Sequence, residues 1–236
     1  MAPSPAVPFA AVIAAAGQGL RAGLGVPKQF ALWRGKALVR RAAEALLDAG
    51  AHPLVVAIPA GADGLAGEVL AGLDVRLVTG GDTRQQSVRQ SLESLQTDAP
   101  AHVLIHDAAR AEIPPAVIGR LLAALADHAG AIPVLPIVDS VAVTRDGLMT
   151  ERADREVLRR VQTPQGFRFG EILAAHRAWT AEVSAGDDAQ VARAAGLAVA
   201  LVEGDERLRK FTFAEDFVTV PAHPRTGTGF DVHRLA

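Results

Sequence analysis

The feature that most constrains this chain is a short, wholly apolar run, Phe9–Ala16, that leads directly into a glycine-rich loop. The run lacks polar alternation, which is typical of a central parallel strand buried on both faces. It is also far shorter than the roughly 20 residues that a membrane span needs. The loop, Ala14–Gln29, would therefore leave a sheet at the carboxyl end of its first strand, where open α/β sheets bind ligands.

Downstream of this loop, short apolar segments alternate with amphipathic ones. Strands are expected at 54–58, 75–78, 102–105, 132–137 and 197–202, and helices at 36–49, 63–71, 83–95, 114–128 and 169–182. Parallel strands need crossover connections, which are usually helices. The pattern therefore predicts an α/β fold with a mostly parallel, Rossmann-like sheet flanked by helices.

Residues 138–161 interrupt this rhythm. The segment is polar and rich in arginine, and it contains Asp146-Gly147, a hairpin turn signal. We interpret it as a protruding β-arm on one large domain that spans 9–222. Residues 1–8 are expected to form a flexible N-terminus, and they carry no Lys or Arg, so they do not resemble a signal peptide.

Composition narrows the classes of function. The formal net charge of −2 over 236 residues gives no reason to expect nucleic acid or an anionic membrane as a partner. There is no cysteine, so disulfides and thiolate chemistry are excluded, and we expect a cytoplasmic location. Any phosphate chemistry must therefore depend on local clusters of positive charge.

The glycine-rich loop offers such a cluster. Glycines let the backbone approach a ligand and present amide donors to phosphate. Arg21 and Lys28 add two cations, and Pro27 restrains the chain beside Lys28. The loop is neither a Walker loop nor the dinucleotide fingerprint. A flexible connection with two solvated bases is the alternative, and the pair of cations makes it the less favoured one.

Asp107 ends the apolar strand that contains V-L-I-H, so its carboxylate is expected at the carboxyl edge of the sheet. One carboxylate together with triphosphate oxygens and water is a common way to hold Mg²⁺. An N-cap aspartate is an equally good reading of the residues alone. We interpret His106 as structural, while Arg110 could contact a ligand, pair with Asp107 or serve the fold.

Six segments of the chain resemble, in order, the signature of the 2-C-methyl-D-erythritol 4-phosphate cytidylyltransferases of the non-mevalonate isoprenoid pathway. The resemblance spans about Phe9 to Val220. The segments are A-A-G-Q-G-L-R with V-P-K-Q, G-G-D-T-R-Q-Q-S (80–87), H-D-A-A-R (106–110), A-D-R (153–155), T-P-Q (163–165) and E-G-D-E-R-L-R-K (203–210).

This resemblance implies a nucleotidyltransferase sheet and assigns roles to residues. Arg21, Lys28 and Lys210 would be catalytic, and Asp107 would bind Mg²⁺ or another divalent cation. The nucleotide would be bound by Ala14, Ala15, Ala16, Gly17, Gly19, Gly81, Asp82 and Ser87. Asp82 or Thr83 could instead cap the helix that follows.

Acceptor binding is assigned by the same resemblance to Arg155, Ser140 and Thr163. The arm would reach across a homodimer, so that Arg155 and Ser140 serve the neighbouring subunit. The chain departs from the family at Gly186 and Ala111, where threonine and proline are common. Ser140 often stands as threonine in the family, and the hydroxyl is retained. None of these departures removes a charged group that the chemistry needs.

The last residues, 223–236, are expected to be a linker and the start of a truncated second domain. T-G-T-G-F-D-V-H-R-L-A resembles the opening of a zinc-dependent cyclodiphosphate synthase, with Asp231 and His233 matching two metal ligands. Two ligands do not make a zinc site, which needs at least three from protein. The chain is thus expected to be the first module of a bifunctional enzyme.

The predicted activity is transfer of CMP from CTP to a small phosphorylated polyol, 2-C-methyl-D-erythritol 4-phosphate, with release of pyrophosphate. One alternative is another polyol-phosphate or sugar-phosphate nucleotidyltransferase, which would share the loop, the lysine and the carboxylate. The other is a nucleotide-binding module without catalysis. Such a module would have no use for Arg155 and Lys210 at an acceptor phosphate.

Overall fold

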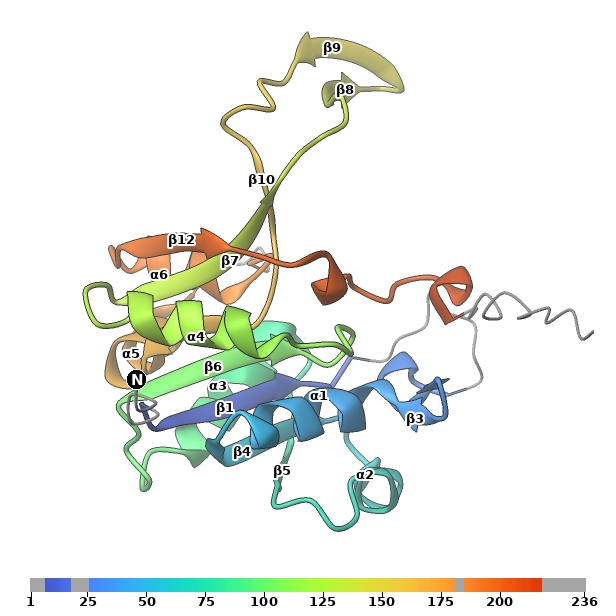
Figure 1. The fold of residues 1–236 in the computed structure, drawn as a ribbon, viewed down its shortest axis with the longest axis vertical. Coiled ribbons are helices and arrows are strands. Elements are labelled where there is room, and N and C mark those ends of the chain that lie inside the picture. Colours follow the sequence, from blue (N-terminus) through green and yellow to red (C-terminus); the bar gives the residue numbers. More distant parts are fainter. Residues whose placement is uncertain (1–6, 18–25, 181–184, 218–236) are drawn as a thin grey trace, which may run out of the picture.

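The chain, seen in a computed structural model that describes residues 7–17, 26–180 and 185–217, is built on one central sheet (Figure 1). Strands β6 (His102–Asp107), β1 (Phe9–Ala14), β4 (Ala51–Ile58) and β5 (Arg76–Thr79) lie side by side and run parallel. On the other side of β6, β11 (Gln165–Arg168) runs antiparallel to both β6 and β7 (Gly130–Pro136). Strand β12 (Val199–Glu203) pairs in parallel with β7. The mostly parallel sheet is confirmed.

Helices cover both faces of this sheet (Figure 1). Helices α1 (Leu38–Asp48) and α4 (Pro115–Ala124) lie on one face, and α3 (Arg84–Ser94), α5 (Phe169–Ala178) and α6 (Asp188–Ala194) lie on the other. Strand β1 shows why both layers are needed. Phe9, Ala11 and Ile13 pack into the core beneath α1 and α4, whereas Ala10 and Val12 pack into the core beneath α3, α5 and α6. The apolar run is thus buried on both faces, as its sequence predicts.

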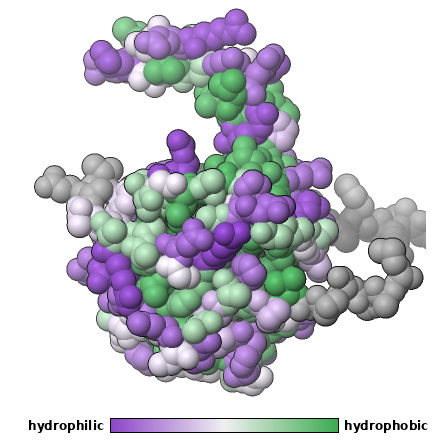
Figure 2. Space-filling view, turned by 90° about the vertical axis from the view of Figure 1, so that its left-hand side faces the viewer, coloured by the Kyte–Doolittle hydropathy of each residue, from purple (hydrophilic) through white to green (hydrophobic). Residues whose placement is uncertain are grey.

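The predicted arm is present. Strands β8 (Ala142–Arg145) and β9 (Leu148–Arg152) form an antiparallel hairpin that stands away from the sheet (Figure 1). Asp146 and Gly147 form its turn with φ of 52° and 78°, a conformation that suits an Asp-Gly pair. Figure 2 shows the arm projecting from the body with apolar surface on its stem. The stem continues into β10 (Arg159–Val161), which pairs with the end of β7.

Several elements differ from the expectation. Lys36–Ala37 forms β3 and pairs with β2 (Leu32–Trp33) around a turn at Arg34-Gly35, so the first helix begins at Leu38 rather than at residue 36. Helix α2 (Asp63–Val69) ends two residues early, and α5 ends at Ala178. Strand β11 and helix α6 were not predicted, because each is too short to show a clear period.

Three 3-10 turns complete the described chain, at Lys28–Phe30, Glu206–Leu208 and Ala214–Phe217. None of the helices within the described ranges is both long and apolar enough to cross a membrane. The expected flexible N-terminus up to residue 6 and the expected linker and second-domain start at 223–236 fall outside those ranges.

Candidate active site

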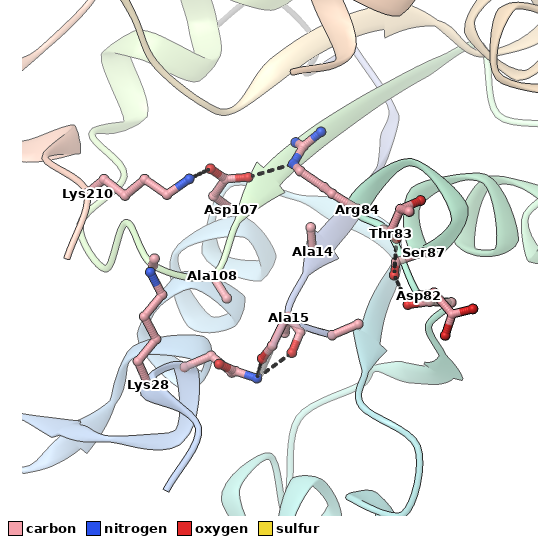
Figure 3. Close-up of a pocket in the computed structure, with 15 residues that line it drawn as sticks. Ala14, Ala15, Lys28, Asp82, Thr83, Arg84, Ser87, Asp107, Ala108 and Lys210 are labelled. Atoms are coloured by element: carbon pink, nitrogen blue, oxygen red, sulfur yellow. Dashed lines mark hydrogen bonds and ion pairs between the residues drawn. The ribbon is translucent and has the colours of Figure 1, made fainter. Parts of the chain in front are cut away.

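A pocket of about 520 Å³ opens where β1 and β6 end. Its walls come from segments far apart in the sequence: Ala14–Gly17 after β1, Lys28 and Gln29, the turn at 81–84 with Ser87, Asp107–Ala109 after β6, and Lys210. In parallel strands the carboxyl ends meet at one edge of the sheet, which brings these loops together. Figure 3 shows Lys28 and Lys210 on one side of the pocket and Asp82, Thr83 and Ser87 on the other.

Asp107 is the electrostatic centre of this pocket. Lys210 Nζ lies 2.7 Å from its Oδ2, and Arg84 Nε lies 3.1 Å from its Oδ1 (Figure 3). Burial alone would raise the pKa of the Asp107 carboxyl, but the positive charges of Arg84 and Lys210 outweigh that effect and hold the pKa well below its usual range. Asp107 is therefore a carboxylate, with a partly buried cationic partner, Arg84, on one side and a more exposed one, Lys210, on the other.

Lys210 reaches Asp107 because the residues around it are anchored. Leu208 and Phe211 are buried, and Phe211 N–H donates to Ala109 O at 2.8 Å. The Phe211 ring packs edge-on against Trp33, with ring centroids 5.1 Å apart. Lys210 follows a 3-10 turn, and its side chain is directed at Asp107.

Lys28 and Gln29 form the neighbouring part of the wall. Lys28 begins a 3-10 turn after Pro27, and its Nζ donates to Phe211 O at 3.1 Å, so both predicted lysines are tied to the same segment. Gln29 is buried, and its amide donates to Ala15 O at 2.6 Å and to Gly17 O at 2.8 Å. Gln29 therefore fixes the shape of the backbone at Ala15–Gly17, which is expected to bind the nucleotide.

The turn between β5 and α3 forms the next wall. Thr83 is the N-cap of α3 and forms a capping box with Gln86, so Thr83 rather than Asp82 caps this helix. Ser87 Oγ donates to Thr83 O at 2.9 Å and is within 3.3 Å of Gly81 O. A Cβ at Gly80 would lie 2.3 Å from that of Ala16, so only glycine lets this turn approach the end of β1.

His106 and Thr163 lie beneath Asp107. Thr163 Oγ1 accepts from Asp107 N–H at 3.0 Å and lies 3.1 Å from His106 Nδ1, and His106 Nε2 lies 2.9 Å from Arg110 O. Burial lowers the pKa of His106 to about 4, so the ring is neutral. His106 is structural, as expected. Thr163 is buried as well and is not among the residues that line the pocket, so its contact with the acceptor stays a prediction.

Arg110 also serves the fold. Its guanidinium donates to Leu208 O and to Val161 O, and so links the segment that carries Lys210 to the stem of the arm. Burial lowers the pKa of Arg110. Of the alternatives left open by the sequence, the structure supports the structural one.

The arm residues do not reach this pocket within one chain. Arg155 donates to Val138 O at 2.7 Å, and both Arg155 and Ser140 belong to the exposed arm. Their contact with an acceptor stays a prediction that needs a second subunit. Gly19 and Arg21 lie outside the described residues. The other predicted catalytic residues, Lys28 and Lys210, line one pocket together with Asp107, the predicted metal ligand.

Three residues of the site were not singled out from the sequence. Arg84 pairs with Asp107 and also with Asp188, whose Oδ2 lies 2.7 Å from Arg84 Nη2. Gln29 orders the end of β1. Arg84 and Gln29 stand inside the segments G-G-D-T-R-Q-Q-S and V-P-K-Q, whereas nothing local marks Asp188 as a partner of Arg84.

No group of three or more His, Cys, Asp or Glu side chains in the described part of the chain could hold a metal by itself. Asp107 offers a carboxylate on the pocket wall, between Lys210 and Arg84 (Figure 3). This donor set fits a hard cation such as Mg²⁺ only when a ligand's phosphate oxygens and water supply the remaining positions.

The chain is similar to proteins of one known family. Residues 9–223 match the family model of 2-C-methyl-D-erythritol 4-phosphate cytidylyltransferase. The bifunctional enzyme IspD/IspF of Erythrobacter litoralis is 60% identical over 99% of this chain, and that of Novosphingobium aromaticivorans is 59% identical over 98%. The chain spans 61% of the length of each of these curated relatives.

Solved structures agree. The crystal structure of 2-C-methyl-D-erythritol 4-phosphate cytidylyltransferase from Thermus thermophilus is similar to this chain, with a TM-score of 0.76 and 35% sequence identity. The match covers 89% of this chain and 95% of the Thermus chain. The structure of the bifunctional IspDF from Campylobacter jejuni is also similar, with a TM-score of 0.76 and 26% sequence identity. That match covers 89% of this chain and 53% of the Campylobacter chain.

Proposed function

The chain belongs to the 2-C-methyl-D-erythritol 4-phosphate cytidylyltransferase family, and we propose that it transfers CMP from CTP to 2-C-methyl-D-erythritol 4-phosphate. The products would be 4-diphosphocytidyl-2-C-methyl-D-erythritol and pyrophosphate. The observation that carries this proposal is the convergence of Lys28, Asp107 and Lys210 on one pocket at the carboxyl edge of the sheet. A capped helix start and the end of β1 close the same pocket.

In the proposed reaction an oxygen of the acceptor phosphate attacks the α-phosphorus of CTP. The bond from that phosphorus to the bridging oxygen breaks, and pyrophosphate leaves with the electron pair. The acceptor phosphate is already ionised at neutral pH, so no protein nucleophile is required. The work of the protein is to hold two anions together and to balance the charge that develops in the transition state.

Lys28 and Lys210 supply positive charge for this purpose. The Lys210 side chain is 44% exposed and held by Asp107, so it can exchange that carboxylate for a phosphate oxygen when substrate binds. Arg21 would add a further cation from the glycine-rich loop. Main-chain groups of Ala14–Gly17, with Gly19, Gly81, Asp82 and Ser87, would bind the nucleotide.

We assign a divalent cation, Mg²⁺ in the first instance, to Asp107 and the triphosphate. When bound, it would neutralise phosphate charge and help to orient the triphosphate. Arg84, which is less exposed than Lys210, would stay at the other carboxylate oxygen. The predicted absence of nucleic acid and membrane partners, and the cytoplasmic location, remain part of this proposal.

A homodimer formed through the arm would complete the acceptor site. Val138, Leu148, Met149 and Val157 on the arm are 68–75% exposed in the single chain, which is unusual for large apolar side chains. In the dimer, Arg155 and Ser140 would face the neighbouring subunit's pocket, with Thr163 holding Asp107 in place. The arginine fork suits a phosphate because it can donate two hydrogen bonds.

The two relatives from Erythrobacter litoralis and Novosphingobium aromaticivorans are named bifunctional enzymes, and the chain covers 61% of the length of each. We therefore propose that the native protein continues into a cyclodiphosphate synthase module after 223–236. The two enzymes would then act in one pathway from one polypeptide.

The direct test is release of pyrophosphate from CTP and 2-C-methyl-D-erythritol 4-phosphate, with and without EDTA. We expect turnover with CTP that EDTA abolishes, and little turnover with UTP or GTP. Faster turnover with another phosphorylated polyol would favour the alternative transferase. Binding of CTP with no pyrophosphate from any acceptor would favour a non-catalytic nucleotide-binding module.

A further inference from the structure

A line of charged side chains runs from the wall of the pocket into the interior behind it. Arg84, at the first position of α3, touches Asp107 with Nε and Asp188 with Nη2. Asp188, at the first position of α6, is fully buried, and its Oδ1 lies 3.2 Å from Nε2 of the equally buried His176 in α5. Three helices behind the sheet thus meet at Asp188, and Arg84 connects this buried carboxylate to Asp107 of the proposed active site.

Stability alone does not explain this group of buried charges. Buried ion pairs seldom stabilise a fold more than apolar side chains of the same volume would. Burial alone would raise the pKa of the Asp188 carboxyl, and the charge of Arg84 with the contact from His176 lowers it instead. The whole group therefore depends on Arg84, whose side chain is 21% exposed at the edge of the pocket.

The orientation of Arg84 is set by its two carboxylates. Nε and Nη2 each have a carboxylate partner, while Nη1 is buried with no hydrogen-bond partner among the described residues. Removing the Asp188 contact would leave Arg84 held by Asp107 alone. The Arg84 guanidinium could then rotate about its single remaining contact, and Asp107 would no longer be held in one orientation.

We propose that Asp188, supported by His176, is a positioning residue that holds Arg84 against one oxygen of Asp107, so that Lys210 is the exchangeable partner at the other. The inference rests on the proposed nucleotidyl transfer. It assigns different parts to the two cations of Asp107. Arg84 stays with the carboxylate through the reaction, and Lys210 (44% exposed) leaves it for a phosphate.

The test compares two neighbouring substitutions that remove the same charge. Asp188→Asn keeps the shape of the side chain but weakens the hold on Arg84. Asp187→Asn is the matched control, because Asp187 caps α6 through Gln190 N–H at 3.0 Å and accepts from Gln165 at 3.2 Å without contacting Arg84. Thermal unfolding of each variant reports on folding, and steady-state kinetics give kcat and the KM for CTP.

We expect Asp188→Asn to lower kcat by about 10- to 100-fold, because a misplaced group at the reacting centre slows the chemical step. The KM for CTP should change by less than about 3-fold, because Asp188 does not contact the nucleotide. Asp187→Asn should keep kcat near the wild-type value. The double variant Asp188→Asn with Arg84→Gln should lose little more than Arg84→Gln alone, because both changes break one connected unit.

Equal kcat values for Asp188→Asn and Asp187→Asn, or fully additive losses in the double variant, would overturn the inference. If Asp188→Asn does not fold, Arg84→Lys decides, since lysine keeps the charge but cannot span two carboxylates. A wild-type kcat in that variant overturns the inference, and a 10-fold loss at unchanged KM for CTP supports it. A wild-type chain that releases no pyrophosphate refutes the proposed function, and the inference falls with it.

Discussion

The neutral, buried His106 makes the stability of the fold sensitive to pH. Burial lowers the pKa of its imidazole from 6.5 to about 4. The unfolded chain therefore takes up a proton at this residue between pH 6.5 and about 4, whereas the folded chain does not. The contribution of His106 is complete above pH 6.5 and is lost as the pH falls towards 4.

The size of the effect follows from the same two values. The interval between 6.5 and about 4 corresponds to roughly 3 kcal/mol of unfolding free energy, at about 1.4 kcal/mol for each pH unit. His106 has no exposed surface, so solvent does not screen this cost. The neutral ring is fixed by contacts with Arg110 O and Thr163 Oγ1, and a proton on Nδ1 would turn an acceptor into a second donor.

Urea unfolding of the wild type and of His106→Gln, measured from pH 4 to 7.5 at one protein concentration, tests this reasoning. The glutamine amide can still donate to Arg110 O, but it does not titrate. We expect the unfolding free energy of the wild type to fall more steeply with acid than that of the variant, by up to about 3 kcal/mol at pH 4. Parallel pH profiles for the two proteins would refute a neutral His106.

Three further outcomes can be checked by standard assays. Lys28→Ala should lower kcat by about 10²–10³ while calorimetry shows CTP still bound; an unchanged kcat would remove Lys28 from the transition state. Arg155→Ala should raise the KM for the acceptor more than the KM for CTP, and the reverse result would place Arg155 away from the acceptor. Thr83→Ala should cost about 1 kcal/mol in thermal unfolding through loss of the α3 cap, and an unaltered melting temperature would contradict that capping role.

The fold class, and the edge of the sheet where the site lies, can be predicted from local patterns of residues. A strand that is apolar at every position must be buried on both faces, and both faces of β1 are buried. The hairpin signal Asp146-Gly147 fixed the arm, since its turn requires positive φ. Lys28, Asp107 and Lys210 could be named because they stand in recognisable segments next to strand ends or in a glycine-rich loop.

Tertiary structure decided the partners of those residues. Arg84 and Asp188 are 104 positions apart, and Lys210 and Asp107 are 103 apart, so no local pattern couples them. The short strand β11 is defined by its pairing with β6 and β7, and helix α6 is held through the buried ion pair of Asp188 with Arg84. Local sequence determines which surfaces must be buried. Which buried charges meet depends on long-range packing, because the strength of an ion pair depends on the distance between its groups in the folded chain and not on their separation in sequence.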